Sequence, residues 1–275
     1  MPFIDSHDGT RLFYSDSGQG RPLVLLSSAT MGHQLWDLHV PTLTEQGRRC
    51  VTYDRRGHGR SDWPWHGYDY DGLADDLHHL VEELDLDGVT LVGNAMGCGE
   101  VVRYLSRHGS ARVERIVLVA TTTPMLAVSP TNPDGLDPGV LEAMLTGLRT
   151  DRPGYTAQIT LPFFAGPGAS PGDLPISQEL AGWMGQQSLN SSLRAATEVY
   201  RTLFTTDLRP DLGKIDVPAL LVHGRRDPVA PIALCAEQSA DEIRDSRLVV
   251  YDDASHGLVV THAARLVQEL LAVTS

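Results

Sequence analysis

The stretch LVGNAMGCGEVVRYL, residues 91–105, passes from an apolar run into a helix-forming segment through the pattern GNAMG, residues 93–97. A Gly-x-Ser-x-Gly pattern between a strand and a helix places a serine hydroxyl on a sharp, strained turn. Here Ala95 occupies the position of the serine. The two flanking glycines let the chain turn tightly, and Gly99 lets the helix approach the sheet. The stretch predicts a nucleophile elbow that lacks its nucleophile; an ordinary tight turn is the alternative.

Apolar runs of strand length alternate with amphipathic segments along the chain, which is typical of a parallel sheet covered by helices. The expected strands are Leu23–Ser27, Cys50–Asp54, Val89–Gly93, Arg115–Ala120, Ala219–Gly224 and Arg247–Tyr251. Helices are expected over Tyr70–Leu84, from about Gly97 onward, and from about His262 to Val273. The expected fold class is α/β, with a mostly parallel sheet flanked by helices.

The alternation stops between about Thr121 and Asp211, where the sequence is rich in proline and glycine. Helical stretches are expected within it around Gly139–Leu148 and Ser191–Phe204. A long excursion between two strands of one sheet predicts an inserted helical cap, and such segments often cover a binding site. We therefore divide the chain into a core, residues 1–120 and 212–275, and a cap, residues 121–211.

Composition excludes several classes of function. Of the 275 residues, 41% are hydrophobic, which is enough for one large core. The formal net charge is −13 and no cluster of Lys or Arg interrupts it, so we expect neither nucleic acid nor a membrane as a partner. The cysteines are odd in number and far apart, which argues against a disulfide framework. The N-terminal residues show no leader pattern, so a cytoplasmic location is expected.

Two later strands are each followed by a residue that would complete a catalytic triad. Asp227 follows Ala219–Gly224, and His256 follows Arg247–Tyr251, so the chain order is elbow, acid, histidine, as such a turn requires. Histidine accepts and returns a proton near neutral pH, and a buried aspartate fixes its tautomer. Asp253 is too close in sequence to His256 to end a separate strand, so Asp227 is the expected acid.

The chain resembles the α/β-hydrolase family, and within it the cofactor-free haloperoxidase or perhydrolase type of serine esterase. The likeness is carried by YDRRGHGRSDWPWHGYDYDGLADDLHHL, the elbow with GEVVRYLSRHG, IDVPALLVHGRRDPVAPI and SHGLVVTHAARL. It implies that Asp227 is the triad acid, His256 the triad base, position 95 the nucleophile site and the Met96 N–H one oxyanion donor. It implies no metal and no organic cofactor.

The expected oxyanion loop departs from the family pattern. Relatives commonly carry His-Gly-Trp-Pro where this chain has Ser27-Ser28-Ala29-Thr30, and a similar loop occurs in 3-oxoadipate enol-lactonases. By position, the second oxyanion donor is the Ala29 N–H, and the small Ala29 predicts a wider acyl pocket. Further pocket contacts, each equally compatible with plain packing, are expected from Ser28, Trp36, Met125, Leu126, Phe163, Phe164 and Trp183.

Alanine at position 95 removes the chemistry that the other residues would serve. A methyl group cannot attack a carbonyl carbon, and losing the nucleophile of such a triad costs subtilisin about 10⁶-fold in kcat. Because every partner of a serine is retained, we favour a deliberate serine-to-alanine change that keeps a substrate or product intact over a natural pseudoenzyme. With serine, the expected reaction is hydrolysis of carboxylic esters or lactones; the resemblance also implies perhydrolysis.

Two other functions fit the sequence. One is a natural cofactor-free lyase, isomerase or oxygenase that uses the pair of Asp227 and His256 as a base. The other is a small-molecule-binding pseudoenzyme with the cavity of a hydrolase. In each case the partner is a small molecule, and a homodimer is compatible with the sequence. Cys98 is expected to point away from the site, and most other histidines, including His58 and His223, are expected at the surface or in turns.

Overall fold

One sheet forms the centre of the computed structural model, which describes residues 2–274. Within these residues the strand order is β1-β2-β4-β3-β5-β6-β7-β8. β1 pairs antiparallel with β2, and β2 with β4, whereas all pairs from β4 to β8 are parallel. The strands are β1 (Phe3–Asp5), β2 (Arg11–Ser17), β3 (Arg21–Leu26), β4 (Arg48–Tyr53), β5 (Val89–Asn94), β6 (Val113–Val119), β7 (Ala219–Gly224) and β8 (Ser246–Tyr251).

The parallel part of the sheet confirms the α/β fold class. All residues of β5 and β7 are buried, and strands buried on both faces read as continuous apolar runs, which is why the sequence revealed them. The sequence did not reveal β1 and β2. β2 reads RLFYSDS and is partly exposed, so it lacks an apolar run although it pairs with β4.

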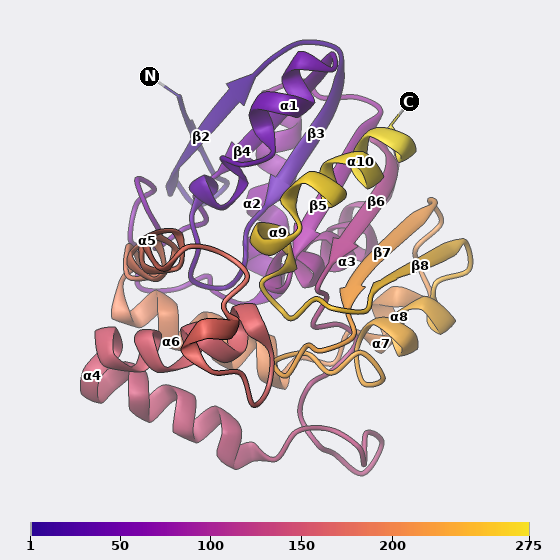
Figure 1. Cartoon of the computed structure of the whole chain (residues 1–275). Helices are drawn as coiled ribbons and strands as arrows, with labels where there is room; N and C mark the ends of the chain where they lie inside the picture. Colours follow the sequence, from indigo (N-terminus) through magenta and orange to yellow (C-terminus); the bar gives the residue numbers. More distant parts are fainter. Residues whose placement is uncertain (1, 275) are drawn as a thin grey trace.

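Helices cover both faces of the sheet (Figure 1). On one face lie α1 (Val40–Glu45), α9 (Leu258–Thr261) and α10 (Ala263–Val273); on the other lie α2 (Tyr70–Glu83), α3 (Met96–His108) and α8 (Ala236–Glu242). Side chains of β3 alternate between the two hydrophobic clusters, because successive residues of a strand point to opposite faces. Leu23 and Leu25 belong to the cluster of α1 and α10, and Val24 and Leu26 to that of α2 and α3.

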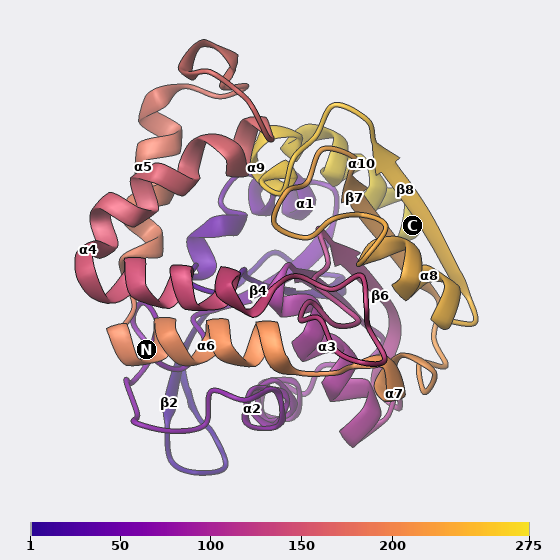
Figure 2. The same cartoon turned by 90° about the horizontal axis from the view of Figure 1, so that it is seen from below.

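Between β6 and β7 the chain forms α4 (Pro138–Ala165), α5 (Gln178–Ser188) and α6 (Leu193–Thr205), then returns through α7 (Arg209–Leu212). α4 packs against α5 and α6, and together they lie beyond the carboxyl ends of the parallel strands (Figures 1 and 2). The backbone of the core joins them directly, since the Gly59 N–H donates to the Asn190 carbonyl at 2.7 Å. The helices of the insertion therefore cover the edge of the sheet at which the elbow and the expected acid and base lie.

The helices of this insertion extend further than the sequence indicated. α4 continues to Ala165 through a kink at Asp151 (φ −153°, ψ 81°), after which Pro153 lies in the first turn of the second segment, where proline is tolerated. α5 was not predicted. Its N-terminus carries a cap that the sequence does contain, because the Ser177 side chain accepts a hydrogen bond from the Leu180 N–H.

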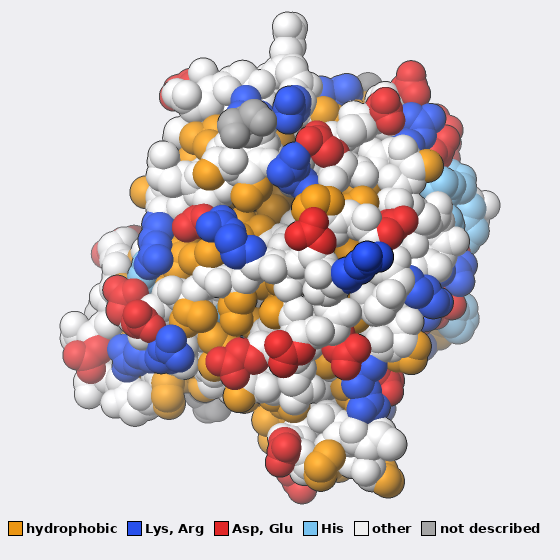
Figure 3. Space-filling view, turned by 90° about the vertical axis from the view of Figure 1, so that its right-hand side faces the viewer, with side chains coloured by type: hydrophobic (Ala, Val, Ile, Leu, Met, Phe, Trp, Pro, Cys, Tyr) orange, Lys and Arg blue, Asp and Glu red, His pale blue; other side chains and the backbone are white. Residues whose placement is uncertain are grey.

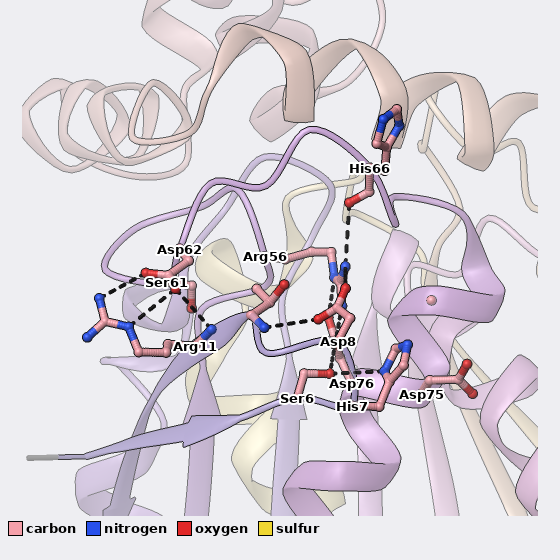
Figure 4. Close-up of polar contacts among 12 residues, drawn as sticks. Ser6, His7, Asp8, Arg11, Arg56, Ser61, Asp62, His66, Asp75 and Asp76 are labelled. Atoms are coloured by element: carbon pink, nitrogen blue, oxygen red, sulfur yellow. Dashed lines mark hydrogen bonds and ion pairs between the residues drawn. The ribbon is translucent and has the colours of Figure 1, made fainter.

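Arg56, in the loop after β4, ties the N-terminal hairpin to α2 (Figure 4). Its Nε donates to Asp76 Oδ2 of α2 at 2.6 Å, and its Nη1 lies 2.8 Å from Asp8 Oδ2 in the β1–β2 turn. Ser6 also donates a hydrogen bond to Asp76. Burial alone would raise the pKa of the Asp8 carboxyl, but hydrogen bonds from Arg56 and Thr10 hold it well below its usual value. The cation of Arg56 therefore has two carboxylate partners.

The surface is mixed in charge on the face drawn in Figure 3. Acidic and basic side chains are interspersed there, and hydrophobic side chains lie between them. Among the helices of residues 2–274, none combines the length and the apolar composition needed to span a lipid bilayer.

Candidate active site

Ala95 forms the turn between β5 and α3 and holds a backbone conformation that side chains rarely adopt. Its φ is 50° and its ψ is −110°. Such a conformation in a residue with a Cβ costs about 1–3 kcal/mol and persists only where the surroundings impose it. The Ala95 N–H donates to the Val119 carbonyl at 2.9 Å, and Thr122 Oγ1 donates to the Ala95 carbonyl at 3.3 Å. The strained geometry of a nucleophile elbow is present although position 95 carries only a methyl group.

The first turn of α3 lies very close to the sheet and to α2. A Cβ on Gly97 would lie 2.9 Å from Leu26 Cβ, and one on Gly99 would lie 2.3 Å from Tyr70 Cζ. Only glycine fits at these two positions without a shift of the neighbours. Cys98, between them, is buried with its Sγ 3.2 Å from the Gly93 carbonyl, and burial raises the pKa of its thiol to about 12. It is therefore an inert thiol and not a substitute nucleophile.

Asp227 and His256 lie in contact after β7 and β8. Asp227 Oδ2 is 2.7 Å from His256 Nδ1, and the two residues are 6% and 3% exposed. The other carboxylate oxygen of Asp227 accepts the N–H groups of Val229 and Ala230, each at 2.8 Å. An aspartate that accepts from Nδ1–H leaves Nε2 of the imidazole as the proton acceptor. Asp253, in contrast, lies 3.3 Å from His262 Nε2 and is highly exposed.

A second histidine faces the same carboxylate. His223 Nε2 lies 3.3 Å from Asp227 Oδ2 and 2.8 Å from the Ala230 carbonyl. Burial by itself raises the pKa of Asp227, but the charge of His256 and hydrogen bonds from both histidines outweigh it, so the pKa lies well below its usual value. The expectation of a surface or turn position for His223 was wrong, because β7 is buried on both faces.

His58 was expected at the surface or in a turn, but it is fully buried. Its Nδ1 lies 2.8 Å from the Arg56 carbonyl, in the loop after β4. Burial and the nearby charge of Arg55 lower the pKa of His58 to about 3. His58 is therefore neutral at physiological pH.

Arg55 holds the loop after β3 through hydrogen bonds to its carbonyl groups. Sequence reasoning did not single out this residue. Nη1 of Arg55 donates to the carbonyls of Ser28 and Ala29, each at 3.1 Å, and Nη2 donates to the Ser27 carbonyl at 2.8 Å. Nε of Arg55 donates to Glu100 of α3 at 2.7 Å, and both residues are buried. One ion pair thus connects the loop after β3 with the first turns of α3.

Two backbone N–H groups near position 95 have no acceptor within the described residues. Met96 is the first residue of α3, and N–H groups of a first helical turn have no intrahelical partner. The Ala29 N–H makes no hydrogen bond to residues 2–274 either. Both residues are buried; Ser28, next to Ala29, and Asn94, two residues before Met96, line a cavity. The two N–H groups are therefore suited to hold an oxyanion.

The cavity lies between the loop after β3, the elbow and the helices of the insertion. The space, including the part open to solvent, is about 700 Å³. One of its lining residues also contacts the pair of Asp227 and His256, because the rings of Phe163 and His256 meet edge to face with centroids 5.1 Å apart. Its apolar wall includes Met31, Leu35, Ile159, Phe163, Phe164 and Met184. Its polar side chains include Ser28, Thr30, Arg152, Tyr155, Ser188 and Tyr200.

Of the pocket contacts expected from the sequence, Ser28, Phe163 and Phe164 line this cavity. The others do not: Trp36 is fully buried against His39, with ring centroids 5.1 Å apart, and Leu126 is buried in the cluster of α2 and α3. Met125 contacts Arg209, and the side chains on α5 that line the cavity are Met184 and Ser188, not Trp183. Sequence alone did not determine which face of α5 turns inward, and it missed Arg152, Tyr155 and Tyr200.

Comparison with known proteins agrees with this architecture. Residues 21–263 match the family described as alpha/beta hydrolase fold. A non-heme haloperoxidase of Rhodococcus erythropolis is 36% identical over 275 residues, covering 99% of this chain and 98% of that protein. A bifunctional esterase/perhydrolase of Acinetobacter calcoaceticus is 31% identical over 277 residues, covering 99% of each. The crystal structure of a bromoperoxidase from Bacillus anthracis superposes with a TM-score of 0.93 at 33% identity, covering 98% of both chains. The chain belongs to the α/β-hydrolase family, in its cofactor-free haloperoxidase type.

Proposed function

We propose that the chain is a serine hydrolase of carboxylic esters or lactones in which alanine stands at the nucleophile position. The observation that carries the proposal is the buried contact of 2.7 Å between His256 Nδ1 and Asp227 Oδ2. Such a pair serves to take a proton from a neighbouring group and return it. The esterase/perhydrolase activity named for one relative supports the reaction class.

With serine at position 95, Nε2 of His256 takes the hydroxyl proton while the serine oxygen attacks the carbonyl carbon. The oxyanion accepts hydrogen bonds from the N–H groups of Met96 and Ala29. The intermediate collapses, and the departing alkoxide takes the proton from His256; in a lactone it stays attached to the acyl group. Water that His256 deprotonates then releases the acid. Hydrogen peroxide in place of that water would yield a peracid.

The strained backbone of Ala95 supports a recent loss of the nucleophile. Alanine bears the strain of a φ of 50° without using it for chemistry, while the acid, the base and both N–H groups remain. We therefore favour a deliberate serine-to-alanine change over a natural pseudoenzyme. The chain as it stands should bind an ester without turning it over.

The test is to compare the chain with its Ala95→Ser variant on p-nitrophenyl esters of several chain lengths and on a panel of lactones. We expect the variant to gain at least about 10³-fold in kcat/KM on one of these substrates, since the nucleophile of a comparable triad is worth about 10⁶-fold. The double variant Ala95→Ser/His256→Ala is the control and should lose that gain. A folded Ala95→Ser protein that is inactive on every ester and lactone would overturn the proposal.

A further inference from the structure

Arg152 lines the cavity with a charge that no carboxylate of residues 2–274 neutralises. Its hydrogen bonds all go to neutral oxygen atoms: Nη1 donates to the Ser191 carbonyl at 2.7 Å, and Nη2 donates to the Ser188 carbonyl and to Ser191 Oγ at 2.7 and 2.6 Å. These bonds use three of the five N–H groups of a guanidinium. Two donors therefore remain for a ligand in the cavity.

The surroundings of Arg152 make its positive charge less favourable, as expected for a cation that would be stabilised by a bound anion. Burial lowers the pKa of Arg152, and the only opposing influence is Tyr200. The adjacent Asp151 does not compensate, because it is exposed and its Oδ1 accepts the Gly154 N–H at 3.0 Å. The kink at Asp151 also makes Arg152 the first residue of a new helical segment, where the helix dipole adds positive potential.

Arg152 and Phe163 lie on separate parts of the cavity wall. Phe163, which touches His256, follows Arg152 on the same helix by about three turns, or roughly 16 Å along the axis. The wall between them is mostly apolar, with Ile159 of α4 and Met184 of α5, and it also includes Thr156 and Thr160. The cavity wall thus carries a cation in one part, a mostly apolar stretch, and in another part Phe163, which packs against His256.

We propose that Arg152 binds a carboxylate of the substrate, and that the substrate is an ester or lactone whose carboxylate lies several methylene groups from the reacting carbonyl. A half-ester of a linear dicarboxylic acid has this form. The planar guanidinium matches a carboxylate in geometry and charge, and the apolar wall matches the methylene chain. The inference rests on the proposed hydrolase function for the reacting end, but the anion site can be tested without turnover.

The first experiment measures binding to the chain with Ala95 by titration calorimetry. The probes are the monomethyl and dimethyl esters of succinic, adipic and sebacic acid, which differ within each pair only in the free carboxylate. We expect one half-ester to bind about 10- to 100-fold more tightly than its diester, as a charged hydrogen bond at a partly buried site allows. Arg152→Met should abolish this preference, and Arg152→Lys should keep part of it.

Arg149→Met is the matched control, because Arg149 lies three residues earlier in the sequence, before the kink at Asp151, and is exposed. It removes the same charge from the protein and should leave the preference for the half-ester within about twofold of the parent. A preference that falls equally in Arg149→Met would show a general effect of net charge and would overturn the proposal.

The second experiment uses the Ala95→Ser background and compares kcat/KM for the same pairs of esters. Arg152→Met should lower the value for the half-ester by about 10- to 100-fold more than the value for the diester. A purely structural role of Arg152 would lower both values equally and would contradict the inference. If Ala95→Ser hydrolyses neither ester, the hydrolase proposal fails, while the titration of the Ala95 chain still decides on Arg152. Equal affinity of that chain for each half-ester and its diester would overturn the anion site.

Discussion

Arg56 and Arg152 are both withdrawn from solvent, but only one of them has anionic partners. Arg56 pairs with Asp76 and Asp8 at the base of the N-terminal hairpin, so its charge is balanced within the fold (Figure 4). Within residues 2–274, the hydrogen bonds of Arg152 go to neutral oxygen atoms, and its side chain borders a cavity. A buried cation that the chain neutralises serves the structure, whereas one left without a carboxylate beside a cavity is suited to a charged ligand.

Stability should separate the two arginines most strongly. Arg56→Met leaves the buried Asp76 without its cation and should lower the free energy of unfolding by about 3–5 kcal/mol. Arg152→Met leaves no carboxylate of residues 2–274 unpaired but removes three hydrogen bonds, so it should lower the free energy of unfolding by about 2 kcal/mol. Urea unfolding followed by circular dichroism measures both, with Arg149→Met as the exposed control. An equal loss in the first two variants would remove the distinction.

His58 extends the comparison to a buried side chain that can become neutral, because a histidine loses its proton in a pH range where an arginine stays charged. Burial lowers the pKa of His58 from 6.5 to about 3, so below pH 6.5 the unfolded chain binds a proton there that the folded chain does not. The free energy of unfolding is therefore unaffected by this group above pH 6.5, and it decreases as the pH falls from 6.5 toward 3. The loss should approach ~1.4 kcal/mol per pH unit within this window. Urea unfolding from pH 7 to 4 should show a shallower slope in His58→Gln; identical slopes would contradict the prediction.

The ion pair of Arg55 with Glu100 should affect the reaction more than the binding of substrate. Glu100→Gln removes the charge that holds Arg55 beneath the carbonyls of Ser27 to Ala29. In the Ala95→Ser background we expect kcat to fall about tenfold with little change in KM, because in the proposed mechanism the loop donates to the oxyanion and not to the resting ester. Glu82→Gln, at a solvent-exposed ion pair, is the control. A raised KM with unchanged kcat would show that the ion pair acts on binding instead.

The smallest effect is expected at Ser191, whose hydroxyl holds Arg152 in place without neutralising it. Ser191→Ala removes one hydrogen bond at 2.6 Å and should lower the free energy of unfolding by about 1 kcal/mol. Because the charge of Arg152 remains, the affinity ratio of half-ester to diester should stay within about threefold of the parent ratio. Titration calorimetry with the pair that the parent discriminates best provides the measurement. If Ser191→Ala abolished the preference for the half-ester, the position of the Arg152 guanidinium, and not its charge alone, would govern anion binding.

The sequence predicted those parts of the molecule that depend on local pattern. β5 and β7 are buried on both faces and therefore appear as apolar runs; the expected acid follows β7, and the expected base follows the partly exposed β8. The carboxyl ends of parallel strands meet at one edge of the sheet, so Asp227 and His256 could be expected near each other before their contact was seen.

What the sequence did not predict depends on partners far apart in the chain. Arg55 contacts Glu100 across 45 positions, and nothing local to either residue indicates the pair. The role inferred for Arg152 depends on two features: no carboxylate of residues 2–274 pairs with it, and it follows the kink in α4 at the cavity. The sequence pattern around Arg152 indicated neither feature. His223 lies in a strand whose burial was predicted, but its contact with Asp227 arises from the turn after β7.

The φ of 50° at Ala95 sets an order of preference among residues at that position. Glycine alone adopts such a conformation without steric conflict, so every other residue there makes the native state less favourable than glycine would. A serine at this turn offsets the strain by its catalytic function, whereas an alanine gives neither catalysis nor a more favourable backbone. Evolution toward thermal robustness without selection for catalysis would therefore be expected to replace this alanine with glycine and leave the rest of the sheet unchanged.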